Sequence, residues 1–263
     1  MSSYAKQRNI GNGWSETYKK VYQYILQVKF HMDPDDQAKV IYDQNILSSA
    51  KGLLLMPEGK WQSDAHNLKS SQVMCYNLFR PMMNDDGSLN DAGLMFVKSV
   101  LHIDVSNNAR GIFEYEDQSS EWTMDRVGKA TNFDFYIEDQ DIRIFIEVKY
   151  TESSFGKATH KNESKYQFYH EKIKYVLGFE TSRQELKDSY QLFRNTIRVS
   201  NNSYSVVLYP SANTKIEEEY ATFIKKYNIP TTPYGSHAIR VYLEDCREYL
   251  HEDFVEKYLP FLD

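Results

Sequence analysis

The stretch that decides the fold covers residues 131–152 and reads TNFDFYIEDQDIRIFIEVKYTE. Its aromatic and β-branched residues predict two strands, which the acidic turn EDQD at 138–141 joins into a hairpin. The second strand alternates between apolar residues at 142, 144, 146, 148 and 150 and a second set made of Arg143, Phe145, Glu147 and Lys149. Successive strand residues point to opposite faces of a sheet. Glu147 and Lys149 are therefore expected on the same face.

Asp134 interrupts the first strand of this hairpin. Aspartate is a poor strand former, and the residues on either side of it, Phe133 and Phe135, are apolar. A buried carboxylate is unfavourable unless a cation pairs with it. The hairpin would bring Asp134 close to Glu147, and a divalent ion between two carboxylates removes their repulsion. The pair predicts a Mg²⁺ site, because this ion prefers hard oxygen ligands and keeps several waters.

Two interpretations of Glu147 and Lys149 remain open at this point. A half-exposed sheet also needs one charged face, so both side chains could simply be solvated. The position of Asp134 within an apolar strand favours the metal site instead. Lys149 would then lie close enough to orient a metal-bound water or to stabilise a transition state.

Composition limits the class of protein. The 263 residues are 41% hydrophobic and 26% charged, which is typical of a folded globular protein with one large or two modest domains. The net charge of −6 argues against a protein that simply coats nucleic acid, although an enzyme can combine a local basic groove with an acidic metal site. The longest apolar run, residues 52–56, is too short to cross a bilayer. No membrane partner is expected.

Cysteine usage and the first residues bear on location. Cys75 and Cys246 are too few for a disulfide framework, and they have no zinc-site spacing. The opening residues lack the apolar region of a secretory signal. A cytoplasmic location is therefore expected, since a reducing compartment suits free thiols.

The pattern of elements predicts one α/β domain. Apolar periodicity indicates two N-terminal helices, one around Tyr18 to Val28 and one that begins near Asp33. Further expected elements are helices over 67–79 and 90–102, strands over 111–117, 132–138 and 142–150, a lysine-rich segment, a helix over 182–198 and a strand over 204–210. A tail of helix, strand and a final helix through Cys246, Leu250 and Phe254 follows. Within the single domain, we expect N-terminal helices at 1–66, a core at 67–212 and an α/β extension at 213–263.

Asp134 followed by Glu147-Val148-Lys149 resembles the signature of the PD-(D/E)XK nuclease superfamily, which has the restriction-endonuclease-like fold. The surrounding segments, over about residues 70–210, are similar to a bacterial branch of that superfamily. They read SSQVMCYNLFRPM, FEYED, TNFDFYIE, IEVKYTESSFG, YQLFRN and VVLYP. The resemblance implies a core of order α-β-β-β-α-β, in which helices flank a central mixed sheet.

The resemblance also implies roles for individual residues. Asp134 and Glu147 would bind Mg²⁺, with Mn²⁺ as a substitute, the backbone carbonyl of Val148 would be a third ligand, and Lys149 would be the catalytic lysine. The chain has Asn132-Phe133-Asp134 where the family name promises Pro-Asp. The proline makes no chemical contribution, so its absence changes little.

Auxiliary carboxylates are less clearly defined. Many members of the superfamily have a helical glutamate as an extra ligand, whereas the matching helix here offers Gln72. Glu114 on the first strand is the preferred auxiliary catalytic carboxylate. Glu152 is a further candidate, with the capping of a turn as its alternative role.

Basic and polar residues after the hairpin are candidates for substrate binding. A lysine-rich segment with few acids could follow phosphates, or it could be a solvated face; its members are Lys157, Lys161, Lys165, Lys172 and Lys174. In the resemblance, Gln191 follows the catalytic lysine and would reach the site. Arg194 shares a helix face with Arg198 and could bind substrate or pair with a structural acid.

The sequence therefore predicts a Mg²⁺-dependent endonuclease that hydrolyses phosphodiester bonds of DNA, in restriction, phage defence or DNA processing. The alternatives are a catalytically inactive nucleic-acid-binding or assembly module of the same fold, and a structural protein with an ordinary charged strand. The intact Asp–Glu–Lys set favours the enzyme. Cutting both strands of a duplex usually needs two active sites, which favours a homodimer.

Overall fold

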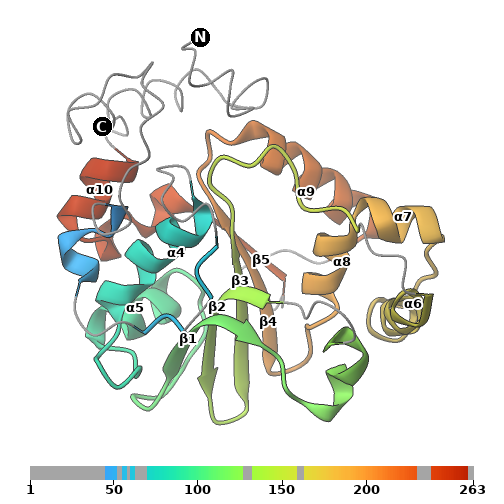
Figure 1. Cartoon of the computed structure of the whole chain (residues 1–263), viewed down its shortest axis with the longest axis horizontal. Coiled ribbons are helices and arrows are strands. Elements are labelled where there is room, and N and C mark those ends of the chain that lie inside the picture. The colour runs from blue at the N-terminus through green and yellow to red at the C-terminus, as the bar shows by residue number, and fades with distance from the viewer. Residues whose placement is uncertain are drawn as a thin grey trace.

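A mixed sheet of five strands forms the centre of the protein (Figure 1). The computed structural model describes residues 45–51, 55–57, 60–62, 70–126, 132–158, 163–229 and 238–259. The strands follow one another in the order β1-β2-β3-β4-β5, with β1 to β3 antiparallel and β3 to β5 parallel. Their bounds are Arg110–Glu116, Asn132–Asp139, Ile142–Val148, Ser203–Tyr209 and Ala238–Tyr242.

Helices cover both faces of this sheet. One face carries α4 (Ser71–Phe79), α5 (Asp91–Ser99) and α10 (Glu252–Tyr258), and the other carries α6 (Glu163–Leu177), α7 (Arg183–Asp188), α8 (Tyr190–Thr196) and α9 (Thr214–Tyr227). Short 3-10 helices complete the described chain at Ser48–Ala50, Arg80–Met82, Ser120–Arg126 and Leu243–Tyr249. The predicted α/β fold, a mixed central sheet flanked by helices in the order α-β-β-β-α-β, is confirmed.

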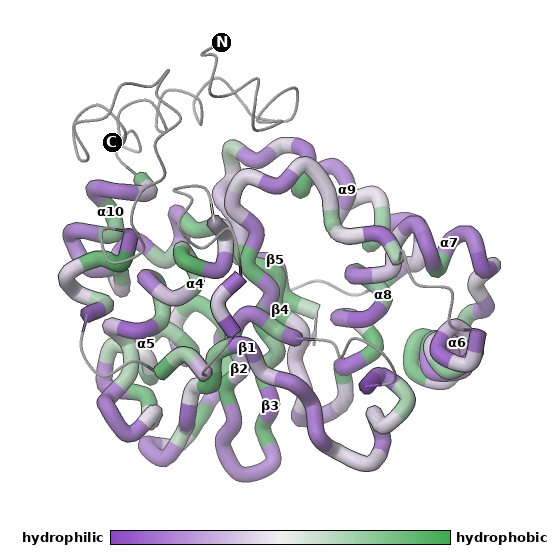
Figure 2. Tube along the Cα trace, in the orientation of Figure 1, coloured by the Kyte–Doolittle hydropathy of each residue, from purple (hydrophilic) through white to green (hydrophobic). Residues whose placement is uncertain are grey.

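Each face of the sheet has its own apolar core. Ile144, Ile146 and Val148 of β3 pack with α4 and α5, as the alternation in the sequence predicted. On the other face, Val207 and Tyr209 of β4 pack with α6, α8 and α9. Because helices cover both faces of β4, its sequence SYSVVLY is a nearly continuous apolar run. Figure 2 shows the same distribution, with hydrophobic residues along the central strands and a hydrophilic α7.

Helix α4 lies directly against the sheet. The hydroxyl of Ser70 accepts a hydrogen bond from the Val73 N–H and caps the first turn. All residues of the helix except Ser71 are buried, and a helix that is buried all round belongs in a core rather than at the surface. The side chains of Gln72 and Cys75 are therefore held inside the protein, next to the strands.

Three predicted elements differ from the structure. The helix expected over 182–198 is divided into α7 and α8 at Ser189, whose φ of −116° and ψ of 31° are not helical. Serine competes with helical hydrogen bonds and is common at such breaks. The lysine-rich segment, for which no helix was expected, contains α6, which buries Tyr166, Tyr169 and Ile173. The final helix is divided in two, because the chain is extended at Leu250 and His251.

The predicted N-terminal helices near Tyr18 and Asp33 lie outside the described residues. The C-terminal extension at 213–263 is joined to the core, because β5 pairs with β4 in the same sheet. The division at 66/67 and 212/213 stays a prediction.

Candidate active site

Three carboxylates form a row across neighbouring strands. The register of β2 places Asp134 between Glu114 on β1 and Glu147 on β3, one step beyond the last β2–β3 pair, Phe135 with Ile146. Facing residues of an antiparallel pair have Cα atoms about 5 Å apart. The predicted proximity of Asp134 and Glu147 is therefore confirmed, and Glu114 extends the row by one strand.

The two central strands separate at this row. The Val148 N–H donates to the Asp134 carboxylate over 2.7 Å, so a side chain replaces the backbone of β2 as its partner. The N–H and C=O of one strand residue point to the same side. The carbonyl of Val148 is therefore also directed toward β2 and Asp134. On β1, Glu114 has a φ of +49°, a left-handed conformation that takes its side chain out of the regular alternation.

Glu147 is buried, and both of its carboxylate oxygens have partners. Only 4% of the residue is exposed. Its carboxylate pairs with the Lys149 ammonium at 2.9 Å and accepts hydrogen bonds from Gln191, Arg194 and Asn195 on α8. Lys149 is 7% exposed, so the interpretation of the two residues as solvated is wrong. Buried charges persist where partners of this kind compensate for lost hydration.

The charge state of Lys149 follows from two opposing effects. Burial lowers the pKa of its ammonium, but the negative charges of Glu147, Glu152 and Asp134 outweigh burial and raise the pKa overall. Lys149 is therefore protonated at neutral pH. The Phe155 ring lies 5.7 Å from its Nζ atom. A buried, permanently charged ammonium suits the stabilisation of negative charge rather than the acceptance of a proton.

Asp134 carries an unfavourable charge in this row. Burial raises the pKa of its carboxyl well above the ordinary value, and repulsion from Glu147 adds to the rise, while Lys149 opposes it. Burial also raises the pKa of the Cys75 thiol on α4, and the charges of Asp134, Glu114 and Glu147 raise it further. Cys75 therefore lies within reach of all three carboxylates, which concentrate negative charge in one place.

The oxygen donors fit a magnesium ion with open coordination positions. Within the described ranges, no three Asp, Glu, His or Cys side chains gather as a metal-binding cluster. Asp134, Glu147 and the Val148 carbonyl nevertheless supply hard oxygen atoms, and Mg²⁺ typically takes one or two carboxylates and fills the remaining positions with water and phosphate. Because Glu147 already has four donors, an ion that bound it would displace at least one of them.

Gln72 occupies the place of the helical glutamate and has a different role. Its amide nitrogen donates to Glu114 over 2.6 Å and to the Lys60 carbonyl over 2.9 Å, and its oxygen accepts from the Gln62 N–H. Asn132 donates to the other oxygen of Glu114. Gln72 therefore fixes Glu114 and ties residues 60–62 to the site. No pattern in the sequence predicted this contact, which spans 42 residues.

Replacement of Gln72 by glutamate should destabilise the protein by about 1–3 kcal/mol. The new carboxylate would repel Glu114, and the Lys60 carbonyl would lose its donor. Ser71→Glu is the matched control, because it adds the same charge one position earlier, in a helix turn that favours acids. Chemical denaturation of the metal-free protein measures both. Equal stabilities of the two variants would contradict this role of Gln72.

The other polar candidates reach the site or cap the chain near it. Gln191 bridges Glu147 and the Gly156 N–H, which donates to its oxygen over 2.9 Å. Arg194 contacts Glu147 at 3.3 Å. Asn195, which no sequence pattern indicated, is a third residue of α8 that donates to Glu147. Glu152 accepts from the N–H groups at 150 and 151, as expected for a cap.

The basic residues are distributed differently from the expected groove. Lys157 is exposed and forms a loose pair with Asp188 at 3.4 Å, and Lys161 lies outside the described residues. The expectation of a phosphate contact is wrong for Lys165, which is buried and donates to the Asp125 carbonyl. Glu121 holds Lys172, and Glu180 holds Lys174.

Arg198 also has a structural role. It is buried beyond the end of α8, pairs with Asp117 and Asp125, and lies over the Trp122 ring with its Cζ atom 3.4 Å from the centroid. The expected shared face of Arg194 and Arg198 is confirmed, because both guanidinium groups lie over the Phe133 ring. Of the two, Arg194 is the one that contacts Glu147 in the candidate site.

The mixed sheet and the carboxylate row with its lysine define a restriction-endonuclease-like protein. A family model described as "Restriction Endonuclease associating with ARP" matches residues 6–256, and the chain belongs to this family. The match extends well beyond residues 70–210, where the sequence resemblance lay. No curated protein and no solved structure matches the chain. None of the helices in the described part has the length and apolar character that a membrane crossing requires.

Proposed function

We propose that the protein is a Mg²⁺-dependent endonuclease that hydrolyses phosphodiester bonds of DNA, in restriction, phage defence or DNA processing. The observation that carries the proposal is the row of Glu114, Asp134 and Glu147, with the Lys149 ammonium 2.9 Å from Glu147. The row lies where β2 and β3 separate, in a member of a restriction endonuclease family. Three neighbouring carboxylates, two of them on buried residues, together with one ammonium suit the binding of both a cation and a phosphate.

The chain's own groups would share the work as follows. Asp134, Glu147 and the Val148 carbonyl would hold Mg²⁺, or Mn²⁺ in its place. The bound ion would lower the pKa of a water and offset charge at phosphorus. Lys149 would donate from its ammonium to a phosphate oxygen or to the attacking water. Glu114, which Gln72 fixes, would add negative charge beside Asp134 and so favour the cation.

Two α8 residues would connect the metal site with the substrate. Arg194 is a charged donor that now contacts Glu147. If Glu147 held the ion, the Arg194 guanidinium would be available to bind a phosphate, its preferred partner. Gln191 would stay between Glu147 and the Gly156 backbone, and so hold the carboxylate in position.

Incubation of the purified protein with circular and linear DNA tests the proposal. Nicked or linear product from the circle should form with Mg²⁺ and disappear with a chelator, because an endonuclease needs no free end. RNA of the same sequence serves as the comparison for substrate class. Binding of DNA without cleavage in Mg²⁺ or Mn²⁺ would favour the inactive binding module instead.

The exposed Lys157 provides a test of DNA contact beside the site. Its side chain is 65% exposed, and it follows directly after Gly156, which contacts Gln191. Lys157→Ala should weaken DNA binding and reduce the slope of log affinity against log salt by about 1. Lys174→Ala is the matched control, since this lysine on α6 is similarly exposed but is paired with Glu180. Identical salt slopes for Lys157→Ala and wild type would exclude the phosphate contact.

A further inference from the structure

The chain segment that follows β3 returns to Lys149. Phe155 is fully buried, and its ring lies 5.7 Å from the Lys149 ammonium. The next residue, Gly156, donates its N–H to the Gln191 side chain and accepts from the Gln191 N–H over 3.2 Å. Residues 155 and 156 therefore contact both Lys149 and one of the α8 side chains that hold Glu147. The backbone position of residues 155 and 156 therefore determines how the Lys149 ammonium and the Gln191 side chain are arranged.

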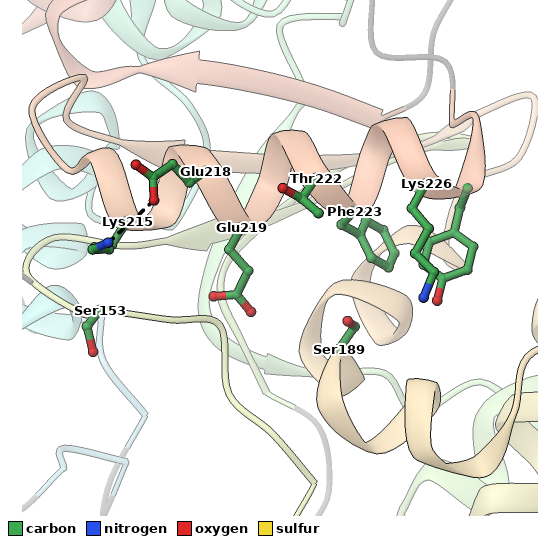
Figure 3. A pocket seen from close by; sticks show the side chains of 9 residues that line it. Ser153, Ser189, Lys215, Glu218, Glu219, Thr222, Phe223 and Lys226 are labelled. Carbon is green, nitrogen blue, oxygen red and sulfur yellow. Dashed lines mark hydrogen bonds and ion pairs between the residues drawn. The ribbon is translucent and has the colours of Figure 1, made fainter.

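Helix α9 of the C-terminal extension holds this segment from outside. The carboxylate of Glu219 accepts a hydrogen bond from the Phe155 N–H over 2.9 Å. At the start of the helix, Asn213 donates to the carbonyls at 150 and 152. Figure 3 shows Glu219 reaching from α9 toward the chain segment that carries Ser153. The extension thus contacts the main chain on either side of residues 153 and 154.

A cavity separates the rest of the segment from the helix. Its volume is about 450 Å³, and its lining includes Ser153, Ser189 and α9 side chains such as Lys215 and Thr222. The Phe155 ring packs against Tyr220 of α9, with 6.2 Å between the ring centroids, so the cavity lies beside the part of the segment around Ser153. The Glu219 hydrogen bond spans the edge of this cavity, and its loss would leave the Phe155 N–H without that partner.

Glu219 also lies within electrostatic reach of the site. Burial raises the pKa of its carboxyl, while the positive charges of Lys157 and Lys149 act in the opposite direction. Glu218, the preceding residue, faces solvent and pairs with Lys215 at 3.4 Å. The two adjacent glutamates therefore differ in their environment, and of these two Glu219 is the one that accepts a hydrogen bond from the segment beside Lys149.

We propose that Glu219 is a positioning residue for Lys149. It fixes the main chain at Phe155, so that the phenyl ring covers the ammonium and Gly156 keeps Gln191 on Glu147. The inference rests on the proposed nuclease function, because the rate of that reaction depends on where the ammonium lies. It extends the active site to a helix that lies outside the region of sequence resemblance.

Three variants test this role, namely Glu219→Ala, Glu219→Gln and the control Glu218→Ala. Glu219→Ala should speed amide hydrogen exchange at residues 153–157 and shift the ¹⁵N resonance of the Lys149 side chain, since the ring would move. Single-turnover cleavage should fall by about 10-fold or more, because small displacements of a reacting group have large effects on rate. Glu219→Gln keeps an oxygen acceptor and should restore most of the rate, while Glu218→Ala should match the wild type.

The two proposals fail in different ways. If wild-type protein does not cleave DNA, the nuclease function is wrong, while exchange and the Lys149 resonance still report on Glu219. If Glu219→Ala has the wild-type exchange pattern, Lys149 resonance and rate, the positioning role is wrong even when the enzyme is active. Loss of rate without a change in the Lys149 resonance would also overturn it, because the effect would then not act through the ammonium.

Discussion

Replacement of Lys149 by alanine is expected to lower the single-turnover rate of DNA cleavage by about 10²-fold or more. This is the usual scale for the loss of a positioned charge stabiliser or proton donor. The ammonium lies 2.9 Å from Glu147 and is protonated at neutral pH because three carboxylates surround it. The rate should be measured with labelled duplex DNA at saturating Mg²⁺.

Two further variants separate chemistry from folding. Lys149→Met fills nearly the same space without a charge, so it should lose the rate as alanine does but keep the packing against Phe155. Lys149→Arg should not restore the rate well, since a planar guanidinium cannot replace a compact ammonium at the same point. Because Lys149 is buried and paired, Lys149→Ala and Lys149→Met should each also lower the metal-free stability of the protein by up to about 3 kcal/mol. Wild-type cleavage by all variants would remove the main support for the nuclease proposal.

Asp134→Asn is expected to abolish cleavage and the stabilisation that Mg²⁺ or Mn²⁺ gives. Ions that bind only the native state raise its melting temperature, and the variant would lack one of two carboxylate ligands. The asparagine oxygen can still accept from the Val148 N–H, so the strands should keep their arrangement. Melting curves with and without Mn²⁺ measure the effect. An unchanged metal-induced shift in the variant would mean that the ion lies elsewhere.

The same variant should be more stable than the wild type when metal is absent. The pKa of Asp134 is raised from its ordinary value of 3.8 in the folded state. The folded protein therefore binds this proton more tightly than the unfolded chain, and its contribution to stability is lost as the pH rises from about 4 through the raised pKa. Asp134→Asn removes this loss. Its metal-free melting temperature should therefore exceed that of wild type, and the difference should grow as the pH rises above 4, which melting curves at several pH values measure.

The local part of the site could be predicted from the sequence. The alternation in β3 assigned Glu147 and Lys149 to one face, and the short turn after β2 brought Asp134 opposite Glu147. Both inferences depend only on strand geometry and a hairpin. Among the elements that surround the hairpin, α4, α5, β1 and β4 also had recognisable patterns, whereas α6 did not.

The partners of these residues could not be predicted in the same way. Asn195 reaches Glu147 across 48 residues, and Glu219 reaches Phe155 across 64. Such contacts depend on how α8 and α9 pack against the sheet, which no periodicity encodes. Lys165 looked like its neighbouring lysines in the sequence, but its burial against Asp125 is a tertiary property. The sequence therefore identified which positions are polar, but it did not indicate which of these side chains are buried.

The left-handed backbone of Glu114 has a consequence for assembly. β1 is an outer strand of the sheet, and outer strands readily pair with strands of other chains. A non-glycine residue in this conformation is unfavourable by about 1 kcal/mol, and it turns the peptide groups away from the straight row that a neighbouring strand would need. The bend that directs Glu114 toward Gln72 thereby interrupts a surface for aggregation. If two copies associate to cut both DNA strands, they would meet through a surface other than the full length of β1.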